Sequence, residues 1–424
     1  MRKKILLLEL NEFNRELLEV GSKLFRFPHI QWLFDLKQSE TLTEDTLQSD
    51  RLDPWVQWVS VHTGTPSTEH KIKHLGDIPD LKTPQLWEKL SDRGVTTGVW
   101  GPLNANRGEA PLCQFFVPDP WTFSEVESPE SLRGLVDFPR YMAQNRVGMN
   151  PFVALRMFLH FCRMVPVKVW WTLIRHSGAV LRSLWAYRFS ASILFTIFEF
   201  ASAGLFIQKT KQSKPQVAIL FVNFFAHFQH YYWPTGDLTS ELKKHPKYYW
   251  ALFYLDLLIG QLRSSLGKEY ALVVYNALSQ ESVLKDKLAI YRVTHYETFF
   301  SSMKLPFKNV KPLMTYDATV FFIDEKERDF AAKFLSGLKI DGQPVFFIET
   351  EGHPTDRLFL RTIYFGQSTA HTKVIGSGVE FLFNDYFSFL GYQTGRHIQT
   401  GTIFSEEINF PRRLPNHEFT EFIL

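Results

Sequence analysis

The chain has little cysteine and almost no excess of charge of one sign. Two cysteines among 424 residues, Cys113 and Cys162, are too few for a disulfide framework and form no metal-binding motif. The formal net charge is +3 and basic runs are short, so the composition indicates no nucleic-acid partner. The N-terminal apolar run stops at Glu9, which makes it too short for a secretory signal peptide. We therefore expect a cytoplasmic protein.

Internal repeats and low-complexity linkers are also lacking, whereas aromatic residues are abundant. The length exceeds the usual limit for one hydrophobic core, which leaves a large domain with insertions or two domains. The 40 phenylalanines and 11 tryptophans supply enough apolar area to fill a large core and also to line a pocket.

Strands and helices alternate along much of the chain. The apolar runs Lys4–Leu10, Val217–Val222 and Tyr270–Tyr275 are typical of buried strands. Asp53-Pro54 predicts the start of a helix, and Thr63-Gly64 predicts its end. This alternation predicts an α/β fold with a mostly parallel sheet sandwiched by helices.

Two insertions interrupt the alternation. We expect the α/β core domain at residues 1–123, 214–300 and 383–424. Strand signals vanish between residues 124 and 213, which predicts a helical cap insertion. Residues 301–382 carry the mixed pattern of a small α+β insertion.

One helical segment, residues 189–208, comes close to the length and composition of a membrane span. Glu199 lies near its centre, so we favour the alternative of a buried helix in a soluble protein. The aromatic and basic sequence around it allows a second interpretation for residues 164–208, weak association with an anionic membrane surface. The alternative to that interpretation is a helical cap packed on the main domain.

The stretch Val217–Trp233 places polar side chains at the C-terminal end of a buried strand. Ligands of open α/β sheets bind at such strand ends, so the stretch is a candidate site. His227 and His230 are three residues apart, and in a helix both would face one metal ion. The alternative is an aromatic loop with hydrogen-bonded histidines, in which His230 packs against Tyr231. The polar side chains of this stretch are Asn223, His227, Gln229 and His230.

Three sequence motifs resemble those of one enzyme family. The order of parts is similar to that of the alkaline phosphatase superfamily, and within it to the type I phosphodiesterase/nucleotide pyrophosphatase-like proteins. The motifs are Trp58-Val-Ser60-Val-His-Thr63-Gly64 with the following Pro66 and His70-Lys-Ile72, then Asn223-x-x-x-His227, and finally Arg396-His397-Ile-Gln-Thr-Gly401.

The resemblance implies hydrolysis or transfer of phosphate, phosphonate or sulfate esters. Members of this family use two divalent metals, commonly zinc, and a threonine or serine nucleophile at the start of a helix. Two cations lower the pKa of a nucleophile and clamp the attacking and leaving oxygens. Together with the spacing of His230, the resemblance gives the candidate metal ligands Asn11, Asn223, His227, His230 and His397.

The chain departs from the family pattern at several of these positions. Asn11 and Asn223 stand where the family has aspartate, and the nucleophile position falls on Pro54. The loop Asn276–Gln280 has neither the aspartate nor the histidine expected after its strand. These losses of negative charge predict one metal site, with zinc as the favoured ion.

Other residues near these motifs offer compensating groups. We assign candidate catalytic roles to Asp53, as a ligand or general base, and to Gln57 on the same helix. The alternative role of Asp53 is that of a helix N-cap. Glu9 and Glu12 flank Asn11 and are further carboxylates near the site.

Two functional hypotheses follow. The first is a cytoplasmic, divergent phosphodiesterase or sulfatase-like hydrolase or transferase that acts on a small-molecule or glycan ester with one divalent metal. The second is a pseudoenzyme that binds an anionic ligand or glycan in the same cleft.

Overall fold

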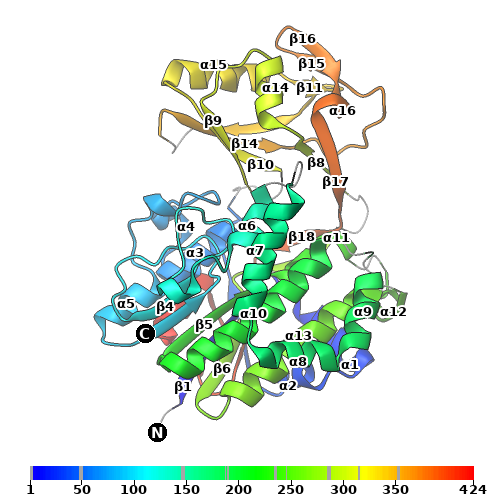
Figure 1. Cartoon of the computed structure of the whole chain (residues 1–424). Helices are drawn as coiled ribbons and strands as arrows, with labels where there is room; N and C mark the ends of the chain where they lie inside the picture. Colours follow the sequence, from blue (N-terminus) through cyan, green and yellow to red (C-terminus); the bar gives the residue numbers. More distant parts are fainter. Residues whose placement is uncertain are drawn as a thin grey trace. The chain divides into compact units, whose positions relative to one another are not determined.

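The structure is a computed structural model, in which two compact units can be distinguished (Figure 1). The first unit contains Met1–Met142, Met149–Leu284 and Gly395–Leu424, and the second contains Ala143–Gly148 and Lys285–Thr394. The structure describes residues 3–46, 51–144, 149–186, 188, 191–233, 236–244, 246–283, 288–313, 316–350 and 354–424.

The first unit is built on one eight-stranded sheet, in the order β20-β2-β19-β6-β1-β5-β3-β4. Every strand pair in it is parallel except those of β19, which runs antiparallel to β6 and β2. The predicted mostly parallel α/β sheet is therefore confirmed. The strands are β1 (Lys4–Leu10), β2 (Lys37–Leu42), β3 (Thr97–Trp100), β4 (Cys113–Val117), β5 (Val217–Val222), β6 (Tyr270–Tyr275), β19 (Thr400–Ser405) and β20 (Arg413–Pro415).

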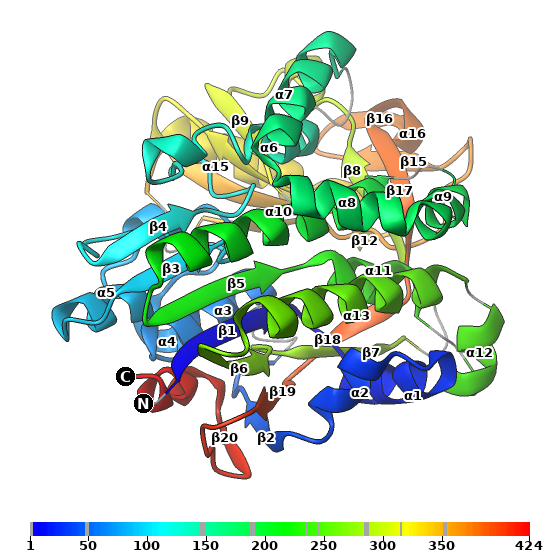
Figure 2. The ribbon, with the colours of Figure 1, turned by 60° about the horizontal axis from the view of Figure 1, so that its bottom comes forward.

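Helices cover both faces of this sheet (Figure 2). One face of β1, with Leu6, Leu8 and Leu10, packs in a common core with helices α10 and α13. The other face turns toward α3, whose Trp58 ring contacts Phe221 and Tyr275. The main helices are α1 (Arg15–Phe25), α2 (Pro28–Leu33), α3 (Pro54–Thr63), α5 (Leu86–Asp92), α10 (Ala191–Ser213), α11 (Phe224–Tyr232), α13 (Pro246–Leu266) and the 3-10 helix η4 (Asn416–Phe422).

Helix α3 begins and ends where the sequence predicts. Pro54 is its first residue, and Gly64 terminates it with a φ of 66°, a backbone conformation that glycine adopts without strain. Helix α5 begins at Leu86, where Gln85 and Glu88 form a capping box.

Residues 124–213 are mostly helical, as predicted. Among the described residues, one segment, Ser192–Ser213, is long and apolar enough to cross a membrane, and 61% of its most apolar window is buried. It packs against α13 and β5, as a core helix does. The other helices here are α6 (Asp137–Gln144), α7 (Pro151–Met164), α8 (Val167–Arg175) and α9 (Ser177–Ala186).

The second unit extends beyond the predicted insertion at 301–382. It begins at Lys285 and ends at Thr394, because β8 (Leu288–Val293) and β17 (Phe387–Gln393) pair with each other inside it. It also contains two four-stranded sheets, in the orders β13-β14-β10-β9 and β12-β11-β15-β16. Their strands are β9 (Asn309–Pro312), β10 (Asp317–Phe321), β11 (Lys339–Ile340), β12 (Gln343–Pro344), β13 (Phe346–Glu349), β14 (Arg357–Thr362), β15 (Lys373–Gly376) and β16 (Val379–Leu382), and its helices include α14 (Tyr296–Ser302) and α15 (Glu325–Ser336).

Candidate functional site

Three side chains meet at the carboxyl edge of the central strands in the first unit. Glu12 follows β1, His230 lies on α11 directly after β5, and His397 lies on β18 (Gly395–Ile398). Strand β18 pairs with β7 (Ser279–Ser282), which follows β6. Since β6, β1 and β5 are neighbours and parallel, their carboxyl ends meet at one edge of the sheet.

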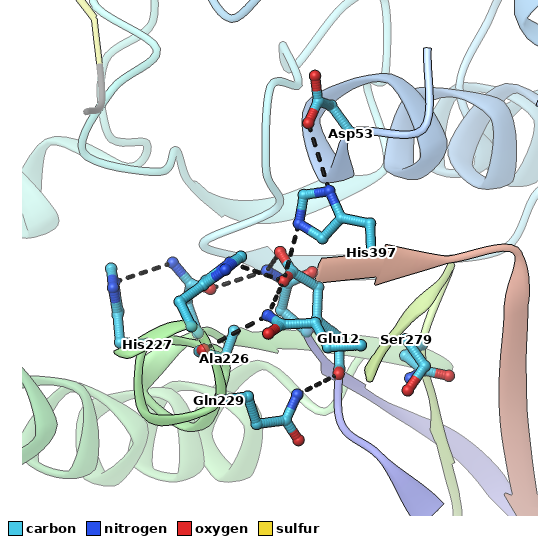
Figure 3. A network of polar contacts seen from close by, with 12 residues as sticks. Glu12, Asp53, Ala226, His227, Gln229, Ser279 and His397 are labelled. Atoms are coloured by element: carbon cyan, nitrogen blue, oxygen red, sulfur yellow. Dashed lines mark hydrogen bonds and ion pairs between the residues drawn. The ribbon is translucent and has the colours of Figure 1, made fainter. Parts of the chain in front are cut away.

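The donor atoms of these three residues lie very close together (Figure 3). Oε2 of Glu12 is 2.9 Å from Nε2 of His230 and 3.2 Å from Nε2 of His397. One ligand atom from each residue lies within 4.8 Å of the other two. We call these three residues the Glu–His–His cluster.

Glu12 is held in place by its backbone and by three amides. Its φ is 55°, a left-handed conformation that is uncommon for a residue with a side chain, and its side chain is 2% exposed. Asn11 Nδ2 donates to Oε1 at 2.9 Å, and Gln280 Nε2 donates to Oε2. Gln229 Nε2 donates to the backbone oxygen of Glu12 at 2.6 Å. The carboxylate is therefore fixed before any ligand arrives.

Asp53 belongs to the same site through His397. It occupies the N-cap position of α3 but makes no capping hydrogen bond with its side chain. Its Oδ1 instead lies 3.4 Å from Nδ1 of His397. A carboxylate at Nδ1 orients an imidazole and directs Nε2 to the opposite side, which here is the side of Glu12. The N-cap alternative thus does not describe the side chain of Asp53.

The electrostatics of the cluster keep it charged. Burial acts to raise the pKa of Glu12, but His397 and His230 outweigh it and hold that pKa well below its usual value. Burial opposes protonation of His397, yet Glu12 and Asp53 raise its pKa to about 10. Without a proton, Nε2 of His397 would point a lone pair at Oε2 of Glu12, 3.2 Å away, so a proton or a cation has to lie between these two atoms.

A second group of side chains lies beside Glu12, and its hydrogen bonds run in one direction. Trp58 Nε1, which can only donate, donates to Asn11 Oδ1 at 2.7 Å. Asn11 Nδ2 then donates to Asn223 Oδ1 at 2.8 Å, and Asn223 Nδ2 lies 3.4 Å from Nε2 of His227. The amide oxygens of both asparagines are thus used by N–H groups. We call Trp58, Asn11, Asn223 and His227 the amide chain.

The predicted metal ligands therefore separate into two sets. His230 and His397 belong to the Glu–His–His cluster, whereas Asn11, Asn223 and His227 belong to the amide chain. His227 and His230 share helix α11 but contact different partners, and the ring of His227 packs against Phe195. The geometry does not direct these two histidines to one ion.

Gln57 has a structural environment. Its Nε2 donates to Asp45 Oδ2 at 2.7 Å and to the Arg51 backbone oxygen at 2.8 Å, and its Oε1 accepts from Asn416 at 2.7 Å. Both ends of the amide are thus engaged, and we assign Gln57 a positioning role rather than the catalytic role expected from the sequence.

The sequence singled out Asn11 rather than its neighbour Glu12 as a ligand. Glu12 flanks Asn11, and an acidic residue at the end of a buried strand is itself a signal of function. Gln280 belongs to the loop in which the sequence offers neither aspartate nor histidine, and it donates to Glu12.

Other histidines lie elsewhere. His62 and His74 are 0% and 2% exposed, and His62 Nε2 lies 2.9 Å from Glu9 Oε1. His70 Nε2 lies 2.9 Å from Ser60 Oγ, and burial lowers the pKa of His70 to about 4, in keeping with a structural role. His371 is exposed and lies in the second unit.

The Glu–His–His cluster fits a divalent metal by donor chemistry and spacing. Two histidine nitrogens and one carboxylate are a common zinc ligand set, which leaves a further position for water or substrate. Ligand atoms that each lie about 2.1 Å from a tetrahedral zinc are about 3.4 Å apart, so separations of 2.9 and 3.2 Å need only a small outward shift. The side chains of His230 and His397 are 21% and 12% exposed, whereas Nε2 of His397 is itself buried.

No family model and no curated protein matches the chain. Solved structures with a similar trace include phosphonoacetate hydrolase from Sinorhizobium meliloti, with 13% identity, 100% of this chain and 95% of that chain covered, and a TM-score of 0.40. They also include ectonucleotide pyrophosphatase/phosphodiesterase 5. The human protein is 9% identical, with 99% of this chain and 94% of that chain covered and a TM-score of 0.46. The murine protein in complex with AMP is 9% identical, with 100% of this chain and 94% of that chain covered and a TM-score of 0.44. These proteins are of the kind that the sequence motifs resemble, but their similarity to this chain is distant. The function is therefore argued from the side chains of the site.

Proposed function

We propose that this protein is a divergent, metal-dependent hydrolase of phosphate or sulfate esters with a single divalent ion. The Glu–His–His cluster carries the proposal, because it brings one buried carboxylate and two imidazoles within 4.8 Å at the carboxyl edge of the sheet. Zinc is the ion that this ligand set favours. The substrate class is a small-molecule or glycan ester, and the compartment is the cytoplasm.

Each residue of the site has a definite task in this proposal. Glu12, His230 and His397 would hold the ion, which when bound polarises an ester oxygen and acidifies water. Asp53 positions His397 through Nδ1 and, at 17% exposure, also offers a carboxylate to an entering water. Because Pro54 replaces the family nucleophile, water is the nucleophile in this proposal, and Asp53 accepts its proton.

A second candidate is supported by the amide chain and by the charge on His397. Asn11 and Asn223 stand in the positions of anionic ligands, and the pKa of His397 is raised to about 10 by Glu12 and Asp53 against the effect of burial. In this candidate protons on His397, rather than a metal, face Glu12 and Asp53, and the site binds an anionic ligand or glycan without hydrolysing it. This is the pseudoenzyme hypothesis.

Elemental analysis combined with an ester assay separates the two candidates. We expect one zinc per chain after dialysis against zinc, and hydrolysis of generic phosphodiester, phosphomonoester or aryl sulfate substrates. His230→Ala and His397→Ala should lose both properties, whereas His371→Ala, an exposed histidine in the second unit, serves as the matched control. A chain that retains no transition metal and whose activity is unchanged in both variants would contradict the metalloenzyme proposal. Metal binding without hydrolysis of any of these esters would favour the pseudoenzyme.

A further inference from the structure

Helices α7, α8 and α9 present large apolar side chains to solvent. Phe152 is 82% exposed, Trp185 80%, Val167 69% and Trp171 65%. Single exposed apolar residues are ordinary, but a concentration of them on consecutive helices marks a surface that binds something. We call the exposed apolar side chains of these helices the outer face; they are Phe152, Val153, Leu155, Phe158, Leu159, Val167, Trp171, Ile174, Leu181 and Trp185.

The outer face follows helical spacing. On α8, Val167, Trp171 and Ile174 are separated by four and three residues, so they lie on one side of the helix. Leu181 and Trp185 repeat the spacing on α9. The opposite sides of these helices supply the buried contacts, through residues such as Val169. The apolar stripe therefore points away from the core and is not part of the packing of the unit.

The acidic and basic residues of the segment that carries α7, α8 and α9 are of one sign only. From residue 150 to residue 198 the sequence contains no aspartate or glutamate. Lys168, Arg175 and Arg182 each come directly after or before an apolar residue of the stripe and are themselves exposed. The basic residues of this span are Arg156, Arg163, Lys168, Arg175, Arg182 and Arg188.

We propose that the outer face binds the surface of a membrane that contains anionic lipids. Exposed tryptophans enter the interface between lipid headgroups and acyl chains, and interleaved lysines and arginines pair with lipid phosphates. A segment with six basic residues and no acidic residue complements a polyanionic lipid surface, and the stripe of aromatic and aliphatic side chains adds the apolar contact that soluble anions cannot use. This inference is independent of the metal site. It places the contact on α7–α9, whereas α10, the more apolar helix, packs within the first unit.

Vesicle flotation tests the proposal on the full chain. Wild-type protein should float with vesicles of phosphatidylcholine containing about 30% phosphatidylglycerol at low salt, and only weakly with phosphatidylcholine alone. The double variant Trp171→Ser/Trp185→Ser should bind at least about tenfold more weakly. Both residues are exposed, so thermal unfolding should stay close to wild type. Ile323→Ser/Phe330→Ser removes two exposed apolar residues, 75% and 56% exposed, from an acidic part of the second unit, and it should bind like wild type.

A charge variant and a sizing measurement complete the test. Lys168→Gln/Arg175→Gln/Arg182→Gln should also weaken binding at least about tenfold and should flatten its salt dependence. Absence of flotation with anionic vesicles at low salt would overturn the proposal, as would equal binding of the tryptophan variant. If sizing shows a dimer that this variant dissociates, and vesicles bind neither form, the outer face is instead a contact between copies of the chain.

Discussion

The Glu–His–His cluster and the amide chain lie side by side on the same strands, yet they differ in charge. Both contain a residue that follows β1 and residues that follow β5: Glu12 with His230 in the cluster, and Asn11 with Asn223 in the amide chain. The pKa of Glu12 is held well below its usual value by the two histidines, against the effect of burial. Behind the amide chain lies another buried carboxyl, Glu199, and burial raises its pKa to about 8.

This difference indicates where a cation can be accommodated. Glu199 accepts hydrogen bonds from the backbone N–H groups of Asn223 and Phe224, at 3.0 and 2.7 Å. These bonds lower its pKa by less than burial raises it. The two asparagine amides carry no charge and the carboxyl of Glu199 stays protonated up to about pH 8, so a doubly charged ion there would lack the anions that the cluster supplies. The cluster has an ionised carboxylate with imidazole donors around it. Asn11 and Glu12 are adjacent in the sequence, yet Asn11 belongs to the amide chain and Glu12 to the cluster.

The largest expected effect comes from removing the charge of the cluster. Glu12→Gln removes the carboxylate among the three proposed ligands, so zinc affinity, measured by calorimetry, should fall at least about a hundredfold and ester hydrolysis should fall with it. Glu16→Gln, an exposed glutamate at the start of α1, is the matched control and should bind zinc like wild type. Unchanged zinc affinity in Glu12→Gln would show that the ion, if bound, is held elsewhere.

A smaller effect is expected from the residue behind His397. Asp53→Asn keeps the size of the side chain but removes the charge beside Nδ1, so zinc affinity should fall about tenfold to a hundredfold. Asp92→Asn, an exposed aspartate at the end of α5, is the control. If Asp53 were only a helix cap, its replacement by asparagine, an equally good cap, would leave zinc affinity unchanged.

The sequence predicts the strands of this site better than the side chains that complete it. The burial of β1, β5 and β6 can be recognised because long apolar runs are a local property of the chain. The choice of Glu12 over Asn11 depends on the left-handed backbone at Glu12, φ 55°, which turns its carboxylate toward His230. No local pattern of residues specifies that turn. The packing of α11 likewise decides that His227 and His230 contact different partners. Their spacing of three residues is therefore not sufficient to predict that both bind one ion.

The amide chain can be converted to test the charge argument. Asn11→Asp/Asn223→Asp places two more carboxylates beside Glu12, and without metal their repulsion should lower the free energy of unfolding by about 1–3 kcal/mol. Excess zinc should reverse this loss and raise the stoichiometry above that of the wild type, as read by elemental analysis and by thermal unfolding with and without chelator. The isosteric variant Asn106→Asp, at an amide in the first unit away from this site, controls for added charge. A double variant that binds no additional zinc would show that charge alone does not separate the two environments.

The neutrality of the amide chain predicts a specific dependence of stability on pH. An unfolded chain ionises Glu199 near its ordinary pKa of 4.5, whereas the folded protein retains the proton up to about pH 8 because the carboxyl is buried. The contribution of Glu199 to stability is therefore complete below about pH 4.5 and is lost as the pH rises toward 8, with a slope of at most about 1.4 kcal/mol per pH unit. Glu199→Gln should remove this slope in urea unfolding measured between pH 5 and 8, while Glu16→Gln, which replaces an exposed glutamate, should retain it. If the wild-type protein instead becomes more stable from pH 5 to pH 8 and Glu199→Gln removes that gain, the carboxyl of Glu199 is ionised behind the amide chain. The amide chain would then have an anion at hand, and the charge difference between the two environments would no longer explain why the cluster alone should hold an ion.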